Sequence, residues 1–394
     1  MNGMRDIASE ILDLLTGDEP MAVCTIIRTW SSAPRPAGTA MAVTASGRAI
    51  GSLSGGCVEG AVHAAAQLTI DDGQPRLGRY GVSDDEAFAV GLACGGQLDV
   101  LIRRVDPTDT ADAEPLAAVC RQILADEPAA LLTRIPLASD ELGEPTGMEY
   151  VLAPPAGRWL AITEPEAEEP AVTGSLGDGQ LDRSVVDGAV GLLAAGTTQI
   201  REYGEHRERL DSDTAVLISA FSRRPRMLIF GAIDYARALA AAAKLVGYHV
   251  TVCDARPVFA TPARFPEADE VVVSWPHRYL QAEIDVGRIE SSTAIAVLTH
   301  DLKFDVPLLQ VALGCPADYV GAMGSRRTND RRIAALREAG VSQELIERLY
   351  APIGLDLGAR TPETTAISIL AEITRERWQA TGVPLRDTTG PIHS

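Results

Sequence analysis

Residues 226–254 read RMLIFGAIDYARALAAAAKLVGYHVTVCD, and they decide the fold. Arg226–Phe230 is a continuous apolar run, which predicts a buried strand. A glycine then opens a turn into a predicted helix over Tyr235–Val246, and His249–Cys253 predicts a second strand that ends at Asp254. A strand, a glycine turn, a helix and a strand that ends in an acid are the layout of a dinucleotide-binding βαβ unit.

The first turn of this unit departs from the dinucleotide-binding pattern. The middle glycine of that pattern lets the backbone approach a pyrophosphate closely, but Ile233 stands here and Asp234 follows it. A branched side chain obstructs that approach, and a negative charge repels the phosphates. The sequence therefore predicts the fold of the unit and argues against NAD(P) at this turn.

The C-terminal part continues the same alternation of strands and helices. Glu270–Ser274 and Thr293–Leu298 are further short β-rich runs with helical segments around them. Strands that alternate with helices form parallel sheets covered on both faces. We expect a Rossmann-like, doubly wound α/β domain over residues 226–380.

The N-terminal part predicts a mixed α+β domain over residues 1–105. Its expected elements are a helix at about residues 4–16, strands at 21–30, 39–44, 49–53 and 97–104, and a helix at about 58–70. Residues 106–222 predict a strand-rich continuation, with a helix near 114–126, a strand at 129–135 and an acidic Pro/Gly-rich stretch at 164–180. Ser222–Arg226 predicts a linker.

The composition of the 394 residues limits the possible partners. A formal net charge of -19 argues against binding to nucleic acid or to an anionic membrane surface. No run is long enough for a membrane span, and the N-terminus lacks the apolar core of a signal peptide. The cysteines are scattered and form no CxxC pair, so we expect a cytoplasmic protein with free thiols.

Two cysteines lie against glycine pairs, Gly55-Gly56-Cys57 and Cys94-Gly95-Gly96. Glycine pairs allow positive φ angles and close approach of the backbone. A thiol on such a turn, directly ahead of a helix, gains a thiolate stabilised by free N–H groups and by the helix dipole. The alternative is that both are small apolar residues at tight turns. Cys57 is the stronger candidate, because Cys94 runs into a strand.

Three further motifs follow predicted strands of the C-terminal domain. His300 and Asp301 suit acid–base chemistry or cofactor orientation, and a helix N-cap is the alternative. Gly324-Ser325-Arg326-Arg327 combines backbone N–H groups with arginine forks that suit a phosphate or carboxylate. In residues 352–363, Thr361 predicts an N-cap, and Asp356 and Arg360 are left as ligand contacts.

The ordered motifs closely resemble the XdhC/CoxI family. They are SSAPRPAGT (31–39), GSLSGGCVE (51–59), GLACGG (91–96), the Rossmann-like unit, LTHD (298–301), YVGAMGSRR (319–327) and APIGLDLGARTPETTA (351–366). The resemblance covers both ends of the chain, roughly residues 10–105 and 226–375. It implies an accessory protein for molybdenum hydroxylases such as xanthine dehydrogenase.

By this resemblance the protein binds molybdenum cofactor, protects it during sulfuration by a cysteine desulfurase, and aids its insertion into the apo-enzyme. The cofactor is molybdopterin, plain or nucleotide-linked. The expected contacts are Arg35, Gly55, Gly56, Cys57, Glu59 and Cys94 in the first domain, with Cys57 as the metal ligand, and the three C-terminal motifs in the second. Gly324-Ser325-Arg326-Arg327 or Arg360 is expected to hold the phosphate. A homodimer is expected. The alternative is an NAD(P)-dependent oxidoreductase with Cys57 as a redox thiol.

Overall fold

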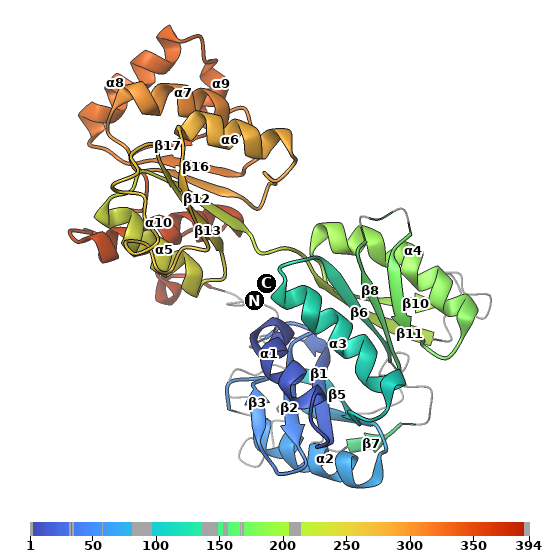
Figure 1. Cartoon of the computed structure of the whole chain (residues 1–394). Helices are drawn as coiled ribbons and strands as arrows, with labels where there is room; N and C mark the ends of the chain where they lie inside the picture. Colours follow the sequence, from blue (N-terminus) through green and yellow to red (C-terminus); the bar gives the residue numbers. More distant parts are fainter. Residues whose placement is uncertain are drawn as a thin grey trace. The chain divides into compact units, whose positions relative to one another are not determined.

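The computed structural model describes residues 3–30, 33, 35–56, 58–80, 97–135, 149–152, 157–165, 167, 169–204 and 214–389. The chain divides into two compact units, one that reaches Arg223 and one that covers Arg224–Thr388 (Figure 1). Each unit has its own sheets and its own hydrophobic cores. We describe them one at a time.

The first unit opens with an antiparallel sheet in the order β3-β2-β1-β5-β4-β7. Its strands are β1 (Met21–Trp30), β2 (Ala40–Thr44), β3 (Ala49–Gly51), β4 (Arg76–Tyr80), β5 (Gln97–Val105) and β7 (Glu149–Val151). Helix α1 (Gly3–Leu15) precedes it, α2 (Glu59–Asp72) covers one face, and α3 (Thr110–Leu124) follows it.

A second antiparallel sheet completes this unit, in the order β10-β11-β6-β8-β9. Its strands are β6 (Ala129–Ile135), β8 (Trp159–Thr163), β9 (Ala171–Gly174), β10 (Gln199–Tyr203) and β11 (Thr214–Phe221), with helix α4 (Gly179–Ala195) packed on it. A buried cluster that includes Leu77, Leu101 and Leu217 joins the two sheets. The acidic Pro/Gly-rich stretch at 164–180, for which the sequence predicts no helix, contains β9 and the start of α4.

The second unit is built on a parallel sheet in the order β14-β13-β12-β15-β16-β17. Numbered from β12, this is the Rossmann order 3-2-1-4-5-6. The strands are β12 (Arg226–Phe230), β13 (His249–Asp254), β14 (Glu270–Val273), β15 (Ala294–Val297), β16 (Tyr319–Ala322) and β17 (Leu349–Tyr350). The helices are α5 (Asp234–Leu245), α6 (Pro276–Asp285), α7 (Leu302–Ala312), α8 (Arg326–Glu338), α9 (Gln343–Glu347) and α10 (Pro362–Arg377), with a short 3₁₀ turn at Leu385–Asp387.

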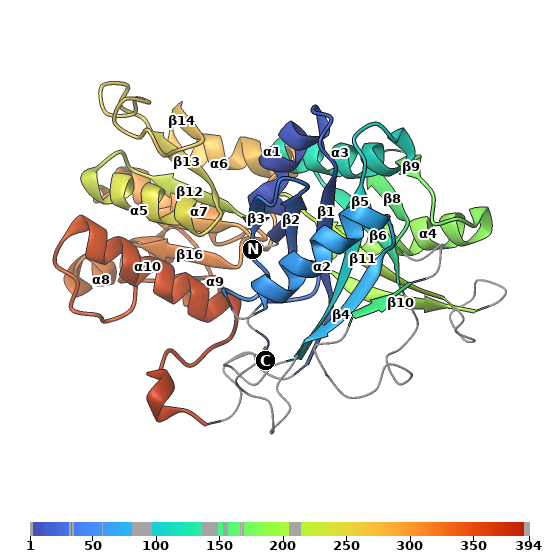
Figure 2. The same ribbon diagram turned by 90° about the horizontal axis from the view of Figure 1, so that it is seen from below.

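Strand β12 is apolar on both faces because helices cover both sides of the sheet. Met227 and Ile229 pack under α5 and α10, and Leu228 and Phe230 pack under α6 to α9. Helices α5 and α10 lie side by side on their face (Figure 2). The expected fold class, a mixed α+β N-terminal part and a Rossmann-like parallel sheet, is confirmed.

Candidate functional site

A pocket of about 400 Å³ opens at the carboxyl edge of the parallel sheet. Its lining comes from the ends of β12, β13 and β15 and from the starts of α6 and α7: Gly231, Ile233, Asp254, Ala255, Arg256, Pro276, Leu298, Thr299, His300, Asp301 and Phe304. Strands β13 and β14 lie on one side of β12, and β15, β16 and β17 lie on the other. The strand order therefore reverses between β12 and β15, and parallel sheets bind ligands at such a switch point.

The first turn of the unit is tight and holds its backbone close to the segment that follows β15. Gly231 has a φ of +113°, and a Cβ there would lie 3.1 Å from the backbone nitrogen of Thr299. Ile233 lines the pocket, as its place in the turn predicts. Asp234 lies beside it, exposed, with a carboxylate oxygen 3.7 Å from Arg264. The Ile233 side chain therefore lies in the pocket lining, and the Asp234 carboxylate lies next to it but outside the lining.

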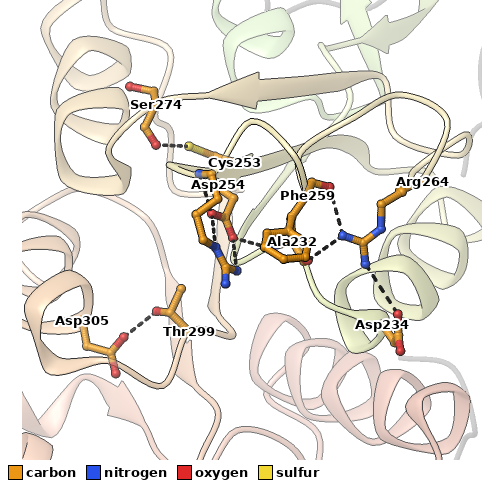
Figure 3. A network of polar contacts seen from close by, with 10 residues as sticks. Ala232, Asp234, Cys253, Asp254, Phe259, Arg264, Ser274, Thr299 and Asp305 are labelled. Carbon is orange, nitrogen blue, oxygen red and sulfur yellow. Dashed lines mark hydrogen bonds and ion pairs between the residues drawn. The ribbon is translucent and has the colours of Figure 1, made fainter.

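Asp254 has the position of the ribose-binding acid, but it is fully engaged (Figure 3). Its Oδ2 accepts hydrogen bonds from the Ala232 backbone N–H (2.8 Å) and from Nη2 of Arg256 (2.8 Å). Its Oδ1 accepts them from the backbone N–H (2.9 Å) and Nε (3.0 Å) of Arg256. Burial raises the pKa of Asp254, but these hydrogen bonds outweigh it and hold the pKa below its ordinary value, so the carboxylate is charged at neutral pH.

All four residues of the LTHD motif line the pocket, and Asp301 and Thr299 also make hydrogen bonds within the protein. His300 and Asp301 line the pocket, and Asp301 also caps α7 by accepting a hydrogen bond from the Lys303 N–H at 3.0 Å. Both sequence interpretations of Asp301 are therefore compatible with its position. The hydroxyl of Thr299 donates to Asp305 (Figure 3).

Asp305 belongs to a buried ion pair that sequence reasoning missed. Its Oδ2 lies 2.7 Å from Nη2 of Arg332, and the exposed side-chain fractions are 1% and 0%. Arg332 also donates to Asn329 and to the carbonyl oxygen of Met323. The pair thus ties the chain after β15 to the chain after β16. Arg332 lies in the sequence RRTNDRR, and no feature of that sequence distinguishes this buried arginine from the exposed arginines near it.

The glycine turn before α8 follows the neighbouring strand but does not line the pocket. Ser325 caps the helix by accepting a hydrogen bond from the Thr328 N–H at 3.1 Å. Arg326 and Arg327 are exposed in the first turn, and their N–H groups precede the first helical hydrogen bond, from Asn329 to the Ser325 carbonyl. Gly324 has the positive φ that this turn requires. These groups fit an anion.

The loop before α10 serves mainly to start that helix. Thr361 is the N-cap and Pro362 the first helical residue, as predicted. The N–H of Gly354 donates to Glu372 at 2.8 Å, and a Cβ at Gly354 would lie 2.5 Å from the hydroxyl of Ser368. The loop is therefore packed against α10. Asp356 and Arg360 are exposed and lie outside the pocket lining.

In the first unit, Glu59 organises the glycine turn that contains Gly55 and Gly56. Its Oε1 accepts hydrogen bonds from the hydroxyl of Ser52 (2.6 Å) and from the N–H groups of residues 53, 54 and 55. Its Oε2 accepts them from the hydroxyl of Ser54 (2.7 Å) and from the N–H groups of Gly56 (2.8 Å) and Val58 (3.2 Å). The prediction that these N–H groups are free to stabilise a thiolate is wrong, because the Glu59 carboxylate occupies them.

This arrangement keeps Glu59 ionised. Partial burial raises its pKa, but the hydrogen bonds from Ser52 and Ser54 outweigh that effect and hold the pKa well below the ordinary carboxyl range. Gly55 and Gly56 have φ angles of +85° and +120°. A Cβ at either glycine meets nothing within 4 Å. The glycines are thus required by the backbone conformation of the turn, and close packing does not demand them.

Three loops of the first sheet leave from the same edge. The register pairs Trp30 with Gln97 and Tyr80 with Leu98, and it pairs Met41 with Gly51. The ends of β1, β3 and β4 and the start of β5 therefore lie at the same end of the sheet. Arg35 follows β1 there, 4.0 Å from Asp6.

Cys57 and Cys94 themselves lie outside the described residues, as do the connections 81–96 and 136–148. The cysteines that are described, Cys24, Cys120, Cys253 and Cys315, are free and buried. Burial raises the pKa of each, to about 12 for Cys120 and for Cys253. The described residues contain no group of three or more His, Cys, Asp or Glu side chains that could hold a metal ion. Among them, no helix is long and apolar enough to span a membrane.

Comparison with known proteins identifies relatives along the whole chain. The chain is 26% identical to a probable xanthine dehydrogenase subunit of Bacillus subtilis, over 93% of this chain and 96% of that protein. It is 26% identical to the molybdenum cofactor insertion chaperone PaoD of Escherichia coli, over 95% of this chain and 88% of that protein. A crystal structure described as a xanthine dehydrogenase from Bacillus halodurans superposes with a TM-score of 0.67 and 25% identity, covering 96% of this chain and 98% of that one.

Two family models match in the order that the motifs predict. The XdhC and CoxI family model matches residues 14–81, which include the glycine turn held by Glu59. The XdhC Rossmann domain model matches residues 227–373, which include the pocket and the two loops beside it. The chain belongs to the XdhC and CoxI family.

Proposed function

We propose that this protein is an accessory chaperone that binds molybdenum cofactor and assists its sulfuration and its insertion into an apo-enzyme of the xanthine dehydrogenase or CO dehydrogenase type. The observation that carries the proposal is the similarity to an insertion chaperone over 95% of the chain, together with both family models. The proposed partners are the apo-hydroxylase and a cysteine desulfurase.

The described residues offer donors for one end of such a ligand. Molybdopterin is a phosphorylated, thiolate-rich pterin, and when bound it supplies the molybdenum at which the client enzyme works. Its phosphate fits the first turn of α8, where Arg326 and Arg327 add positive charge to backbone N–H groups that have no partner within the helix. The glycine turn of the first unit does not fit a phosphate, because Glu59 already fills it with a carboxylate. We therefore propose the first turn of α8 as the phosphate site, and we propose Cys57 separately as a soft ligand for the metal.

Cofactor retention by arginine variants tests this assignment. We expect Arg326→Ala with Arg327→Ala to retain about tenfold less molybdenum cofactor under anaerobic conditions, since two charge-assisted contacts to a phosphate are lost. Arg337→Ala is the matched control, because Arg337 lies at the other end of the same helix. Retention is measured as molybdenum and pterin that remain after gel filtration. Equal loss in the control and the double variant contradicts the assignment.

Cys57 is tested separately. Cys57→Ala should weaken cofactor retention and leave the circular dichroism spectrum and the melting temperature unchanged. Unchanged retention would place Cys57 among the structural residues. A co-purification experiment that finds neither an apo-hydroxylase nor a cysteine desulfurase argues against the proposed partners.

The second candidate is an NAD(P)-dependent oxidoreductase, favoured by the pocket at the switch point of the Rossmann unit. Ile233 and Asp234 oppose it at the pyrophosphate position. Titration with NADH separates the two candidates, since tight NADH binding without cofactor retention supports the enzyme. We also propose a homodimer in the cytoplasm, to be measured by light scattering and by cell fractionation.

A further inference from the structure

Arg256 occupies the carboxylate oxygens of Asp254, the acid at the position that a Rossmann unit uses to bind ribose. In such a unit the acid at the end of the second strand accepts hydrogen bonds from the ribose hydroxyls. A carboxylate has about four lone-pair sites, and the four donors from Ala232 and Arg256 occupy all of those on Asp254. While Arg256 stays, Asp254 has no acceptor left for a ribose diol.

Arg256 is held in this position from a second side. Its guanidinium lies over the ring of Phe259, 4.5 Å from the centroid, an arrangement that adds cation–π attraction. The Asp254 side chain is 5% exposed and that of Arg256 is 50% exposed. The ion pair therefore joins a buried carboxylate to a half-exposed guanidinium. Arg256 can be removed without opening a cavity in the core.

A ribose diol gains no free energy by displacing Arg256. Hydroxyl and guanidinium contacts to Asp254 both involve the charged carboxylate, but the guanidinium contact also joins two opposite charges and is bidentate, from Nε and Nη2 of Arg256. Two hydroxyl contacts to Asp254 therefore return no more than the two guanidinium contacts that they replace. Ile233 and Asp234 oppose a pyrophosphate at the adjacent turn. The ribose acid is thus occupied within the pocket, and the pyrophosphate position is opposed by Ile233 in the lining and by the Asp234 charge beside it.

We propose that Arg256 is a specificity-determining residue that makes this pocket reject ligands with a free ribose 2′,3′-diol. The residue acts on the ligand through Asp254, by occupying its oxygens.

Mononucleotides are the direct probe, because they avoid the obstructed pyrophosphate position. Adenosine 5′-monophosphate and its 2′-deoxy analogue are titrated against the full chain by calorimetry. The wild-type protein should bind both weakly and equally. Arg256→Ala should bind the ribonucleotide about tenfold tighter than the wild-type protein does, and about tenfold tighter than it binds the deoxy analogue.

Three variants control the result. Arg264→Ala removes a neighbouring arginine that also lies over the Phe259 ring, at 5.4 Å, but whose polar contacts run to Asp234 and to backbone carbonyls; it should behave as wild type. Adding Asp254→Asn to Arg256→Ala should abolish the preference for the ribonucleotide. Phe259→Ala should give an intermediate gain, because it loosens Arg256 without removing it.

The outcomes separate this inference from the proposed function. A wild-type protein that already prefers the ribonucleotide, or an Arg256→Ala variant that gains no preference, overturns the role of Arg256. The mononucleotide titration uses no molybdenum cofactor, so its result does not depend on the proposed function.

Discussion

Glu59 acts on its surroundings as a fixed internal anion. The turn that it holds has the donor arrangement of an anion-binding nest, and the protein fills that nest with its own carboxylate. The contacts run mostly from backbone N–H groups, so removing the carboxylate leaves several buried or half-buried donors without an acceptor. Glu59 is therefore a positioning residue for the segment in which Cys57 lies.

Glu59→Gln should lower the free energy of unfolding of the first unit by about 1–3 kcal/mol. An amide offers one acceptor oxygen, and its NH₂ group faces backbone N–H donors that the second carboxylate oxygen had satisfied. The measurement is urea denaturation followed by tryptophan fluorescence. Glu114→Gln is the matched control, because Glu114 makes an exposed ion pair with Arg121, a contact worth about 0–1 kcal/mol.

The Glu59 carboxylate also makes the stability of the first unit depend on pH in the acid range. Its pKa in the folded protein is lower than the ordinary value of 4.5, so its stabilising contribution is complete above about pH 4.5. The contribution is lost as the pH falls from there towards the folded pKa. The difference in unfolding free energy between wild type and Glu59→Gln should therefore shrink between about pH 5 and pH 3. A difference that grows on acidification contradicts this role.

At the scale of elements, the ion pair of Asp305 and Arg332 joins α7 to α8 behind the pocket. Arg332→Met should destabilise the second unit by about 3–5 kcal/mol, because it leaves a buried carboxylate without its partner. Adding Asp305→Leu should recover part of that loss, since a buried pair replaced by apolar side chains is often neutral. Thermal unfolding of the full chain measures both. A double variant less stable than the single one argues against this account.

Most elements of the fold could be predicted from local pattern. Strand β12, apolar on both faces, is predicted at its observed bounds, and so is β6 at 129–135. Helix α4 escaped prediction because it begins inside an acidic Pro/Gly-rich stretch, where Asp178 caps it. The local composition there indicates a loop, and the helix is stabilised by packing of its apolar side chains on the second sheet.

The site was predictable in part, for a different physical reason. His300 and Asp301 could be placed because they follow a strand of a parallel sheet, where ligands bind. The hydrogen-bond partners of Glu59 and Arg332 could not be predicted, because they are backbone groups and residues that come near only on folding. Arg256 follows Asp254 by two residues, and that spacing is the signal that could have revealed the closed acid.

At the scale of the molecule, we propose that the boundary of the two units at Arg223 and Arg224 is also a boundary of stability. Each unit has separate hydrophobic clusters. Calorimetry should therefore resolve two transitions. Ile229→Ala creates a cavity under α5 and α10 and should lower only one of them, by about 2–5 kcal/mol in free energy. A single transition that shifts as a whole contradicts independent units.

The burial of four cysteines has a practical consequence for anyone who handles this protein. Cys24, Cys120, Cys253 and Cys315 have raised pKa values and little contact with solvent, so they react slowly with disulfide reagents and alkylating dyes in the native state. Any rapid phase in a thiol titration must then come from Cys57 or Cys94. A reporter attached during such a phase would therefore mark a glycine–cysteine motif without prior removal of the four buried cysteines.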